Sequence, residues 1–115
     1  MGIYGAVPFF ADADSTECLT TEFPLPSGTL ENLNVTLSGA PGTSASYTLT
    51  VFLSGSPTSL ACTISGSNVS CSDTADKVTV GALDTLSVVA TPSPTKSAPN
   101  VPIAQSTLWS VQFLP

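Results

Sequence analysis

The chain has 115 residues, of which only 9% are charged, and a formal net charge of −6. Its only cations are Lys77 and Lys96, and it contains neither Arg nor His. Binding to nucleic acids, sulfated glycans or anionic membranes draws on many Lys and Arg side chains, so we expect no nucleic-acid partner. No window approaches the roughly 20 apolar residues of a membrane span, so we expect no membrane insertion.

The chain alternates apolar and polar residues with a period of two, which is typical of half-buried strands. Residues 1–14 come first, and we expect Ile3 to Phe10 to form an edge strand or an arm. The apolar positions that we expect to face a core are, in chain order, Leu33, Val35 and Leu37; Tyr47, Leu49, Val51 and Leu53; Val78 and Val80; Leu86 and Val88; and Trp109, Val111 and Phe113.

Gly, Pro, Ser and Asn separate these runs. We predict a loop at Ser38–Thr43, a tight turn at Ser54–Pro57, and a hairpin connection at Gly81–Asp84. Thr91–Pro102 carries four prolines, which predicts a surface loop or a sheet edge. Seven to nine short strands at this spacing indicate an all-β fold, an antiparallel, jelly-roll-like β-sandwich in a single domain over residues 1–115.

Two of the three cysteines, Cys62 and Cys71, flank a stretch that could be a β-hairpin. If Gly66-Ser67 is a two-residue hairpin loop, counting outward places Cys62 opposite Cys71 on the face that also carries Ile64 and Val69. We therefore predict a Cys62–Cys71 disulfide, the alternative being two buried free thiols.

A disulfide favours an oxidising location, so we expect the protein to be extracellular, at a cell surface or on a virion. Cys18 is left over. We expect it to be buried, and pairing between chains of an oligomer is the alternative.

No catalytic motif is present. A serine nucleophile would need a base, and in the absence of His only Lys77 and Lys96 remain, both of which are more typical of solvated surface residues. The eight acids (Asp12, Asp14, Glu17, Glu22, Glu31, Asp73, Asp76 and Asp84) lie mostly beside turn residues, and nothing selects a catalytic pair. We expect a protein that is not an enzyme, with a two-carboxylate hydrolase as a minor alternative.

The spacings Asp12-Ala-Asp14 and Asp73-Thr-Ala-Asp76 offer oxygen ligands of the kind that Ca²⁺ takes. Neither matches an EF-hand loop, and acids at turns are the simpler interpretation. We therefore expect neither a metal nor another cofactor.

Phe52 and Leu108 break the alternation, because each lies next to an inward-facing residue and should point outward. An outward apolar side chain on a strand marks a second packed layer or a subunit interface. We take Phe52 and Leu108 as interface candidates.

The part of the chain from Gly28 to Phe113 resembles the C-terminal β-rich trimeric head module of bacterial and phage collagen-like and tail-fibre proteins. The resembling segments are Pro26–Val35, Tyr47–Gly55, Leu60–Gly66, Cys71–Thr74, Val78–Ser87 and Leu108–Phe113. Members often carry Asn-Gly where this chain has Ser54-Gly55, and Ala-Gly-Asp where it has Ala82-Leu83-Asp84. These departures lie at turns.

The resemblance implies a compact β-sandwich that forms a homotrimer on a fibrous stalk and brings no catalytic residues with it. We therefore expect a structural or adhesive head whose work is trimer nucleation, with contact to a glycan or host receptor as a second role. The alternative is a monomeric carbohydrate-binding module that uses Tyr4, Phe9, Phe10 or Phe52 as stacking platforms.

Overall fold

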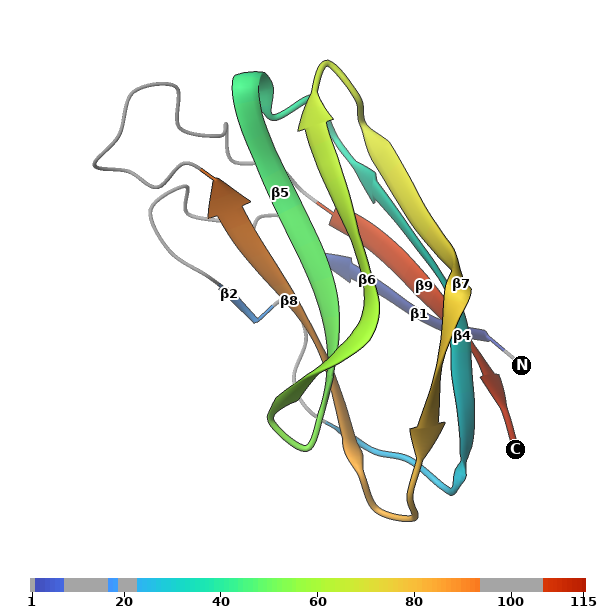
Figure 1. The fold of residues 1–115 in the computed structure, drawn as a ribbon. Coiled ribbons are helices and arrows are strands. Elements are labelled where there is room, and N and C mark those ends of the chain that lie inside the picture. Colours follow the sequence, from blue (N-terminus) through green and yellow to red (C-terminus); the bar gives the residue numbers. More distant parts are fainter. Residues whose placement is uncertain (1, 8–16, 19–22, 94–106) are drawn as a thin grey trace.

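The computed structural model describes residues 2–7, 17–18, 23–93 and 107–115. These residues form nine strands and no helix (Figure 1). The strands are β1 (Gly2–Val7), β2 (Glu17–Cys18), β3 (Phe23–Pro24), β4 (Gly28–Leu37), β5 (Gly42–Leu53), β6 (Ser56–Gly66), β7 (Ser70–Val80), β8 (Thr85–Ser93) and β9 (Thr107–Leu114).

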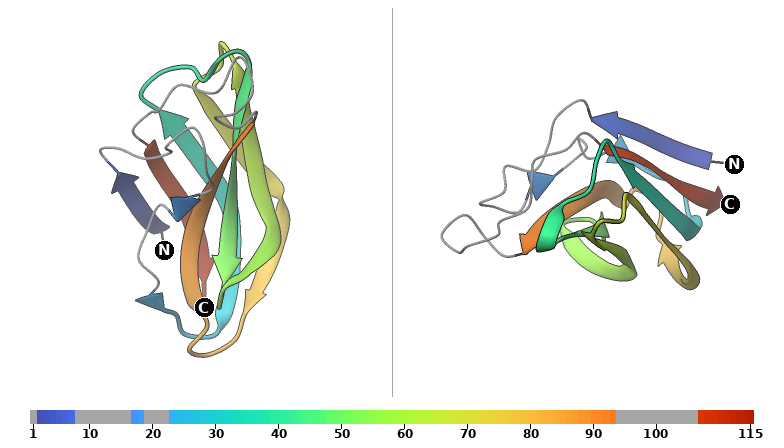
Figure 2. Two further views of the ribbon diagram at one scale, coloured as in Figure 1. Left: turned by 90° about the vertical axis from the view of Figure 1, so that its left-hand side faces the viewer. Right: turned by 90° about the horizontal axis from the view of Figure 1, so that it is seen from above.

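The strands make two antiparallel sheets that pack face to face (Figures 1 and 2). Sheet A has the order β1-β9-β4-β7, and sheet B has the order β2-β8-β5-β6, with β3 also paired to β8. The predicted antiparallel β-sandwich is therefore confirmed.

The strand order is that of a jelly roll. With the two-residue β3 set aside, the first strand pairs with the last (β1 with β9), and the pairing continues inward as β2 with β8, β4 with β7 and β5 with β6. Such nested antiparallel pairs roll up into two four-stranded sheets when β9 also pairs with β4 and β8 with β5. Consecutive strands therefore often lie in different sheets.

A single hydrophobic core lies between the sheets, as the alternation predicts. Every apolar position expected to face inward is buried, except Leu53 and Val78, which are half-buried and still pack against the core. The fully buried members are led by Tyr47 of β5 and Phe113 of β9, one from each sheet. Leu25 and Leu30, which the alternation did not single out, are also buried in this core.

The turns confirm one prediction and contradict another. Ser54 and Gly55 connect β5 to β6 as a tight hairpin turn, and both have positive φ, 51° and 81°. Gly81–Asp84 connects β7 to β8, but β7 belongs to sheet A and β8 to sheet B. The predicted hairpin at Gly81–Asp84 is therefore wrong, because this turn carries the chain across the sandwich.

The N-terminal prediction is confirmed in its edge-strand form for residues 3–7, since β1 lies at the edge of sheet A. Residues 8–10 of that prediction lie outside the described residues. The predicted loop at Thr91–Pro102 begins later than expected, because β8 continues to Ser93 and Pro92 is buried opposite Tyr47. Its remainder lies outside the described residues.

Candidate functional site

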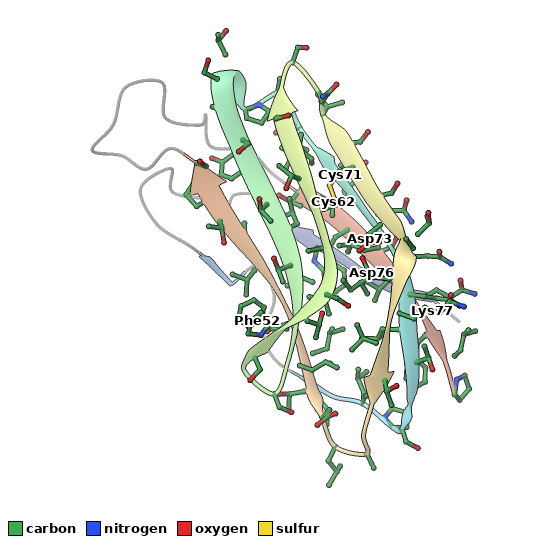
Figure 3. All side chains as sticks on the ribbon, viewed as in Figure 1. Phe52, Cys62, Cys71, Asp73, Asp76 and Lys77 are labelled. Carbon is green, nitrogen blue, oxygen red and sulfur yellow. A yellow bond between two sulfur atoms is a disulfide. The ribbon has the colours of Figure 1, made fainter. Side chains whose placement is uncertain are left out.

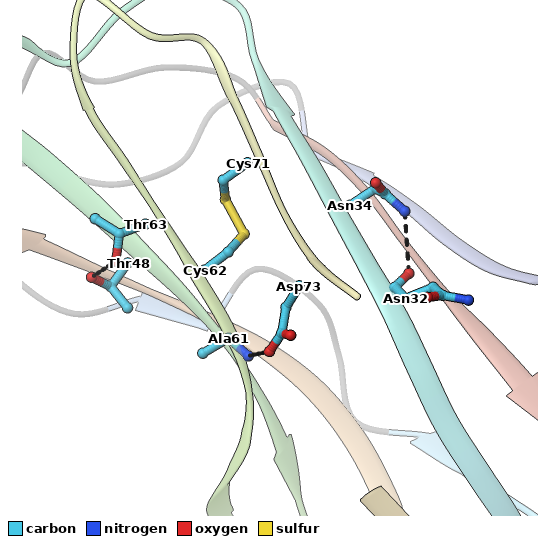
Figure 4. The surroundings of a disulfide bond; sticks show 8 residues. All are labelled: Asn32, Asn34, Thr48, Ala61, Cys62, Thr63, Cys71 and Asp73. Carbon is cyan, nitrogen blue, oxygen red and sulfur yellow. Dashed lines mark hydrogen bonds between the residues drawn. A yellow bond between two sulfur atoms is a disulfide. The ribbon is translucent and has the colours of Figure 1, made fainter. Parts of the chain in front are cut away.

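The seam between the two sheets runs along β6 and β7. Each is the last strand of its own sheet, and no backbone ladder joins them. An unpaired strand edge exposes a row of N–H and C=O groups that invites pairing with other chains. At this seam two such edges face each other, and two side-chain connections join them (Figures 3 and 4).

The first connection is the Cys62–Cys71 disulfide, whose Cα atoms lie 5.8 Å apart. Cys62 sits opposite Leu49 of β5, and Cys71 sits opposite Val35 of β4. Both cysteines are half-buried against the core. The bond thus joins sheet B to sheet A from the inside of the seam (Figure 4).

The predicted pair is therefore present, but the hairpin that led to it is wrong. The backbone N–H of Asn68 donates to the carbonyl of Ser65, so a turn does form, yet the chain then leaves sheet B. The N–H of Leu37 in β4 donates to the carbonyl of Val69, which draws the next strand into sheet A. As a result Val69 is 43% exposed instead of sharing the inner face with Ile64.

The second connection is the carboxylate of Asp73 in β7, which is only 8% exposed. Its Oδ2 accepts the backbone N–H of Ala61 in β6 at 3.1 Å. Its Oδ1 accepts the N–H groups of Ala75 and Asp76, also at 3.1 Å each. One side chain therefore pairs an edge N–H of sheet B and fixes an irregular stretch of sheet A.

That irregular stretch is a bulge where β7 passes β4. The register shifts between Glu31, which pairs with Lys77, and Leu33, which pairs with Asp73. Asn32, opposite the shift, has φ of 55°, and its Nδ2 donates to Oε1 of Gln112 at 2.7 Å. The bulge brings Asp76 close to Asp73 (Figure 3).

The two acids push each other's pKa in opposite directions. Burial raises the pKa of Asp73, but hydrogen bonds from Asp76, Ala61 and Ala75 outweigh burial and hold the pKa below its usual value. Hydrogen bonding with Asp73 and repulsion from its charge raise the pKa of Asp76. Asp73 therefore loses its proton at a lower pH than Asp76.

Separated pKa values are also typical of catalytic carboxylate pairs. Here, however, both oxygens of Asp73 accept backbone N–H groups, which is the arrangement of a structural carboxylate. Lys77, the described candidate for a Ser-Lys pair, is 64% exposed, and its Nζ lies 3.3 Å from Oε2 of Glu31, whose side chain is 12% exposed. Lys96 lies outside the described residues.

The Asp73–Asp76 spacing suggested oxygen ligands, but Asp73 is held by N–H donors on both oxygens. Within the described ranges, no group of three or more His, Cys, Asp or Glu residues could hold a metal ion. Asp12 and Asp14 lie outside the described residues. The local hydrogen bonding expected of turn acids is seen again at Asp84, whose Oδ2 accepts the N–H of Gly81 at 2.7 Å.

The two interface candidates both point outward, on opposite faces of the sandwich. Leu108 of β9 lies on the outer face of sheet A beside Thr36 and is 60% exposed. Phe52 of β5 follows the buried Val51 and lies half-buried on the outer face of sheet B, opposite Ser87 (Figure 3). The seam with its two connections lies at the side, between these faces.

Sequence reasoning singled out Asp73 only as a possible oxygen ligand and missed its structural role, because that role depends on a bulge and on a strand of the other sheet. It also did not locate an uncharged, hydroxyl-bearing surface on sheet B. The sequence signal that could have located this surface is the complete lack of Asp, Glu, Lys and Arg in β5, β6 and β8.

None of the described segments forms a helix long and apolar enough to cross a membrane. No known protein-family model, curated protein or solved structure gives a significant match to this chain. The arrangement on which a function can be argued is thus a jelly-roll sandwich with a cross-linked seam and two different outer faces.

Proposed function

We propose that the chain is the structural or adhesive head of an extracellular fibrous protein and assembles into a homotrimer through its two outer faces. In this proposal Leu108 of one copy packs near Phe52 of the next. The head nucleates the trimer, and contact with a glycan or host receptor is its second role.

The observation that carries the proposal is the placement of Leu108 and Phe52 on opposite faces of one sandwich. A two-fold dimer uses the same patch on both copies, whereas a ring of three uses two different patches that meet head to tail. An apolar side chain on each opposite face suits the ring. Neither side chain is needed for the core, which the inward-facing residues already fill.

The turn geometry supports the resemblance on which the proposal also rests. Ser54 and Leu83 stand where members of the trimeric head family often carry Asn and Gly, and their φ angles are 51° and 71°. Asn and Gly are the residues that adopt positive φ most readily. The backbone at both departures is thus the one that the family residues would favour.

The Cys62–Cys71 disulfide supports an extracellular setting, at a cell surface or on a virion, because stable disulfides persist in oxidising compartments. Jelly rolls recur in viral capsid and lectin domains. That is an analogy of fold, and it carries less weight than the placement of the two faces.

The alternative is a monomeric carbohydrate-binding module with Phe52 as a stacking platform. It is favoured by the outward position of Phe52, which leaves part of the ring exposed. The other aromatic candidates, Tyr4, Phe9 and Phe10, have no described side-chain surroundings.

The mass of the protein in solution separates the two functions. We expect light scattering behind size exclusion to give a trimer at micromolar concentration. L108S should shift the sample toward monomer, while L83S should not, because Leu83 is equally apolar and even more exposed but lies in the β7–β8 turn. A wild-type monomer at 100 µM would overturn the head proposal.

A further inference from the structure

Charge is distributed unevenly over the sandwich. The strands β5, β6 and β8 contain no charged residue at all. Glu31, Asp73, Asp76 and Lys77 all lie on β4 and β7 of sheet A. The charged position of sheet B is Glu17 in β2, whose Cα pairs with Ala90 along the β8 edge. The residues of β5, β6 and β8 therefore contribute no charge to the outer face of sheet B.

This outer face carries rows of hydroxyl groups. The registers place Ser46 between Ser93 of β8 and Ser65 of β6. Two residues along β5, Thr48 lies between Thr91 and Thr63 in the same way. These positions alternate with the buried Tyr47, Ile64 and Pro92, so they face outward. We call the six residues Ser46, Thr48, Thr63, Ser65, Thr91 and Ser93 the hydroxyl face.

The hydroxyl face is ordered and continues into a groove. The Oγ1 atoms of Thr48 and Thr63 lie 3.0 Å apart, within hydrogen-bond distance. Across strands the rows repeat at about 4.8 Å, and along a strand at about 7 Å. At the end of the sheet, where β5 bulges between Gly42 and Ser46, an open groove is lined by Ser44, Ala45, Ser46, Ser65, Gly66 and Ser93.

We propose that the hydroxyl face and its groove bind a neutral glycan. This deepens the glycan contact of the proposed function and rests on that part of it. A hydroxyl group both donates and accepts hydrogen bonds, so an array of them matches the hydroxyls of a sugar chain without any change of charge. The groove gives one end of such a chain a recess between β5, β6 and β8.

Other occupants fit this face less well. An anionic glycan would find no cation on β5, β6 or β8 to pair with. An apolar protein surface would leave these hydroxyls buried without partners, which costs free energy for each of them. The trimer contact proposed at Phe52 lies four residues along β5 from Thr48 and six from Ser46, about 13 and 20 Å away, so the groove lies at the end of the hydroxyl face that is farthest from this contact.

The test uses a printed glycan array that holds neutral, sialylated and sulfated glycans, followed by calorimetry with the neutral glycans retained. T48V/T63V removes two hydroxyls and keeps the shape of the side chains and their β propensity. T79V is the matched control, because Thr79 is also exposed but lies on β7 of sheet A. We expect the wild type and T79V to bind neutral glycans alike, and T48V/T63V to bind at least about tenfold more weakly.

Binding to no neutral glycan, equal binding to anionic glycans, or binding by T48V/T63V within twofold of wild type would each overturn the proposal. Oligomeric mass, measured on the same samples, keeps it distinct from the head function. A trimer that binds no glycan would contradict only the proposal that the hydroxyl face binds a glycan. A monomer that binds neutral glycans through Thr48 and Thr63 would contradict only the proposal of a trimeric head.

Discussion

The carboxylate of Asp73 accepts the backbone N–H of Ala61 across the seam between the sheets, with 3.1 Å between Oδ2 and N. A backbone N–H on an edge strand is normally left to water or to another chain. Here it is paired by a side chain of the opposite sheet. Asp73 therefore acts together with the Cys62–Cys71 disulfide, and each should matter to stability in its own way.

Replacing Asp73 by Ala should destabilise the fold by about 2–3 kcal/mol, because three N–H groups lose a charged acceptor at once. Urea unfolding followed by tryptophan fluorescence gives the change in the free energy of unfolding. E31Q is the control, since it removes the acid that pairs with Lys77, keeps the shape of the side chain, and should cost less than D73A. Equal effects of D73A and E31Q would contradict the structural role of Asp73.

The two acids also predict an unusual response to pH. Asp73 has a folded pKa below its unfolded value of about 3.8, so its stabilising contribution is present above that value and is lost as the pH falls through the folded pKa. Asp76 has a folded pKa above 3.8, so its ionised form destabilises the fold, and protonation relieves this as the pH falls toward the folded pKa. The contribution of the pair should therefore peak near pH 4.

D76N separates the two effects, because Asn cannot ionise. We expect D76N to raise Tm at pH 7, and the gain to vanish as the pH falls through the folded pKa of Asp76. Thermal unfolding by circular dichroism between pH 3 and 7 measures this. A Tm gain that stays constant down to pH 3 would show that charge repulsion between Asp73 and Asp76 is not its cause.

Removing the disulfide with C62A/C71A should cost about 2–3 kcal/mol, the loop-closure estimate for cysteines nine residues apart, or about 10 °C in Tm. Dithiothreitol offers an internal control. It should lower the Tm of the wild type and leave the Tm of C62A/C71A unchanged. A wild-type Tm that does not respond to complete reduction would mean that the bond adds nothing to the Asp73 connection.

The core could be predicted from the sequence because the inward and outward positions of a strand are a local property. The alternation at Tyr47, Leu49 and Val51 is enough to place them, whichever strand lies alongside. The seam could not be predicted in the same way. Counting outward from Gly66-Ser67 assumes that the chain folds back within one sheet, whereas the bond from Leu37 to Val69 takes it into the other.

The disulfide pair was nevertheless predicted, because a short connection brings Cys62 and Cys71 together in either arrangement. The role of Asp73 does not follow from a short connection in this way. Its role depends on the β4–β7 bulge opposite Asn32 and on the N–H of Ala61, which belongs to the other sheet. Long-range pairing of this kind is the part of the site that the local pattern does not contain.

Leu83 should be replaceable with a gain in stability. Its φ is 71° and its side chain is 79% exposed. The left-handed backbone therefore costs conformational free energy that no burial of the apolar side chain offsets. L83G should stabilise the fold by about 0.5–1 kcal/mol in urea unfolding. V69G, at an exposed apolar residue without positive φ, should destabilise it instead, and a gain in both variants would point to lost surface hydrophobicity as the cause.

The head-to-tail trimer makes a prediction that a two-fold interface does not. L108S keeps an intact Phe52 face, and F52S keeps an intact Leu108 face, so neither variant alone should assemble. Mixed at equal concentration, they share one intact contact and should form a 1:1 heterodimer, because the remaining faces cannot close the ring. Native mass spectrometry with one variant isotopically labelled detects this species.

Two controls make the mixing experiment decisive. Each variant must keep a Tm within a few degrees of wild type, since Phe52 is half-buried and its loss could loosen the sheet. L83S keeps both faces and should form the trimer by itself, because Leu83 lies in the β7–β8 turn and on neither face. Monomers of both variants that stay separate after mixing, although both are folded, would show that Leu108 and Phe52 do not meet across one interface.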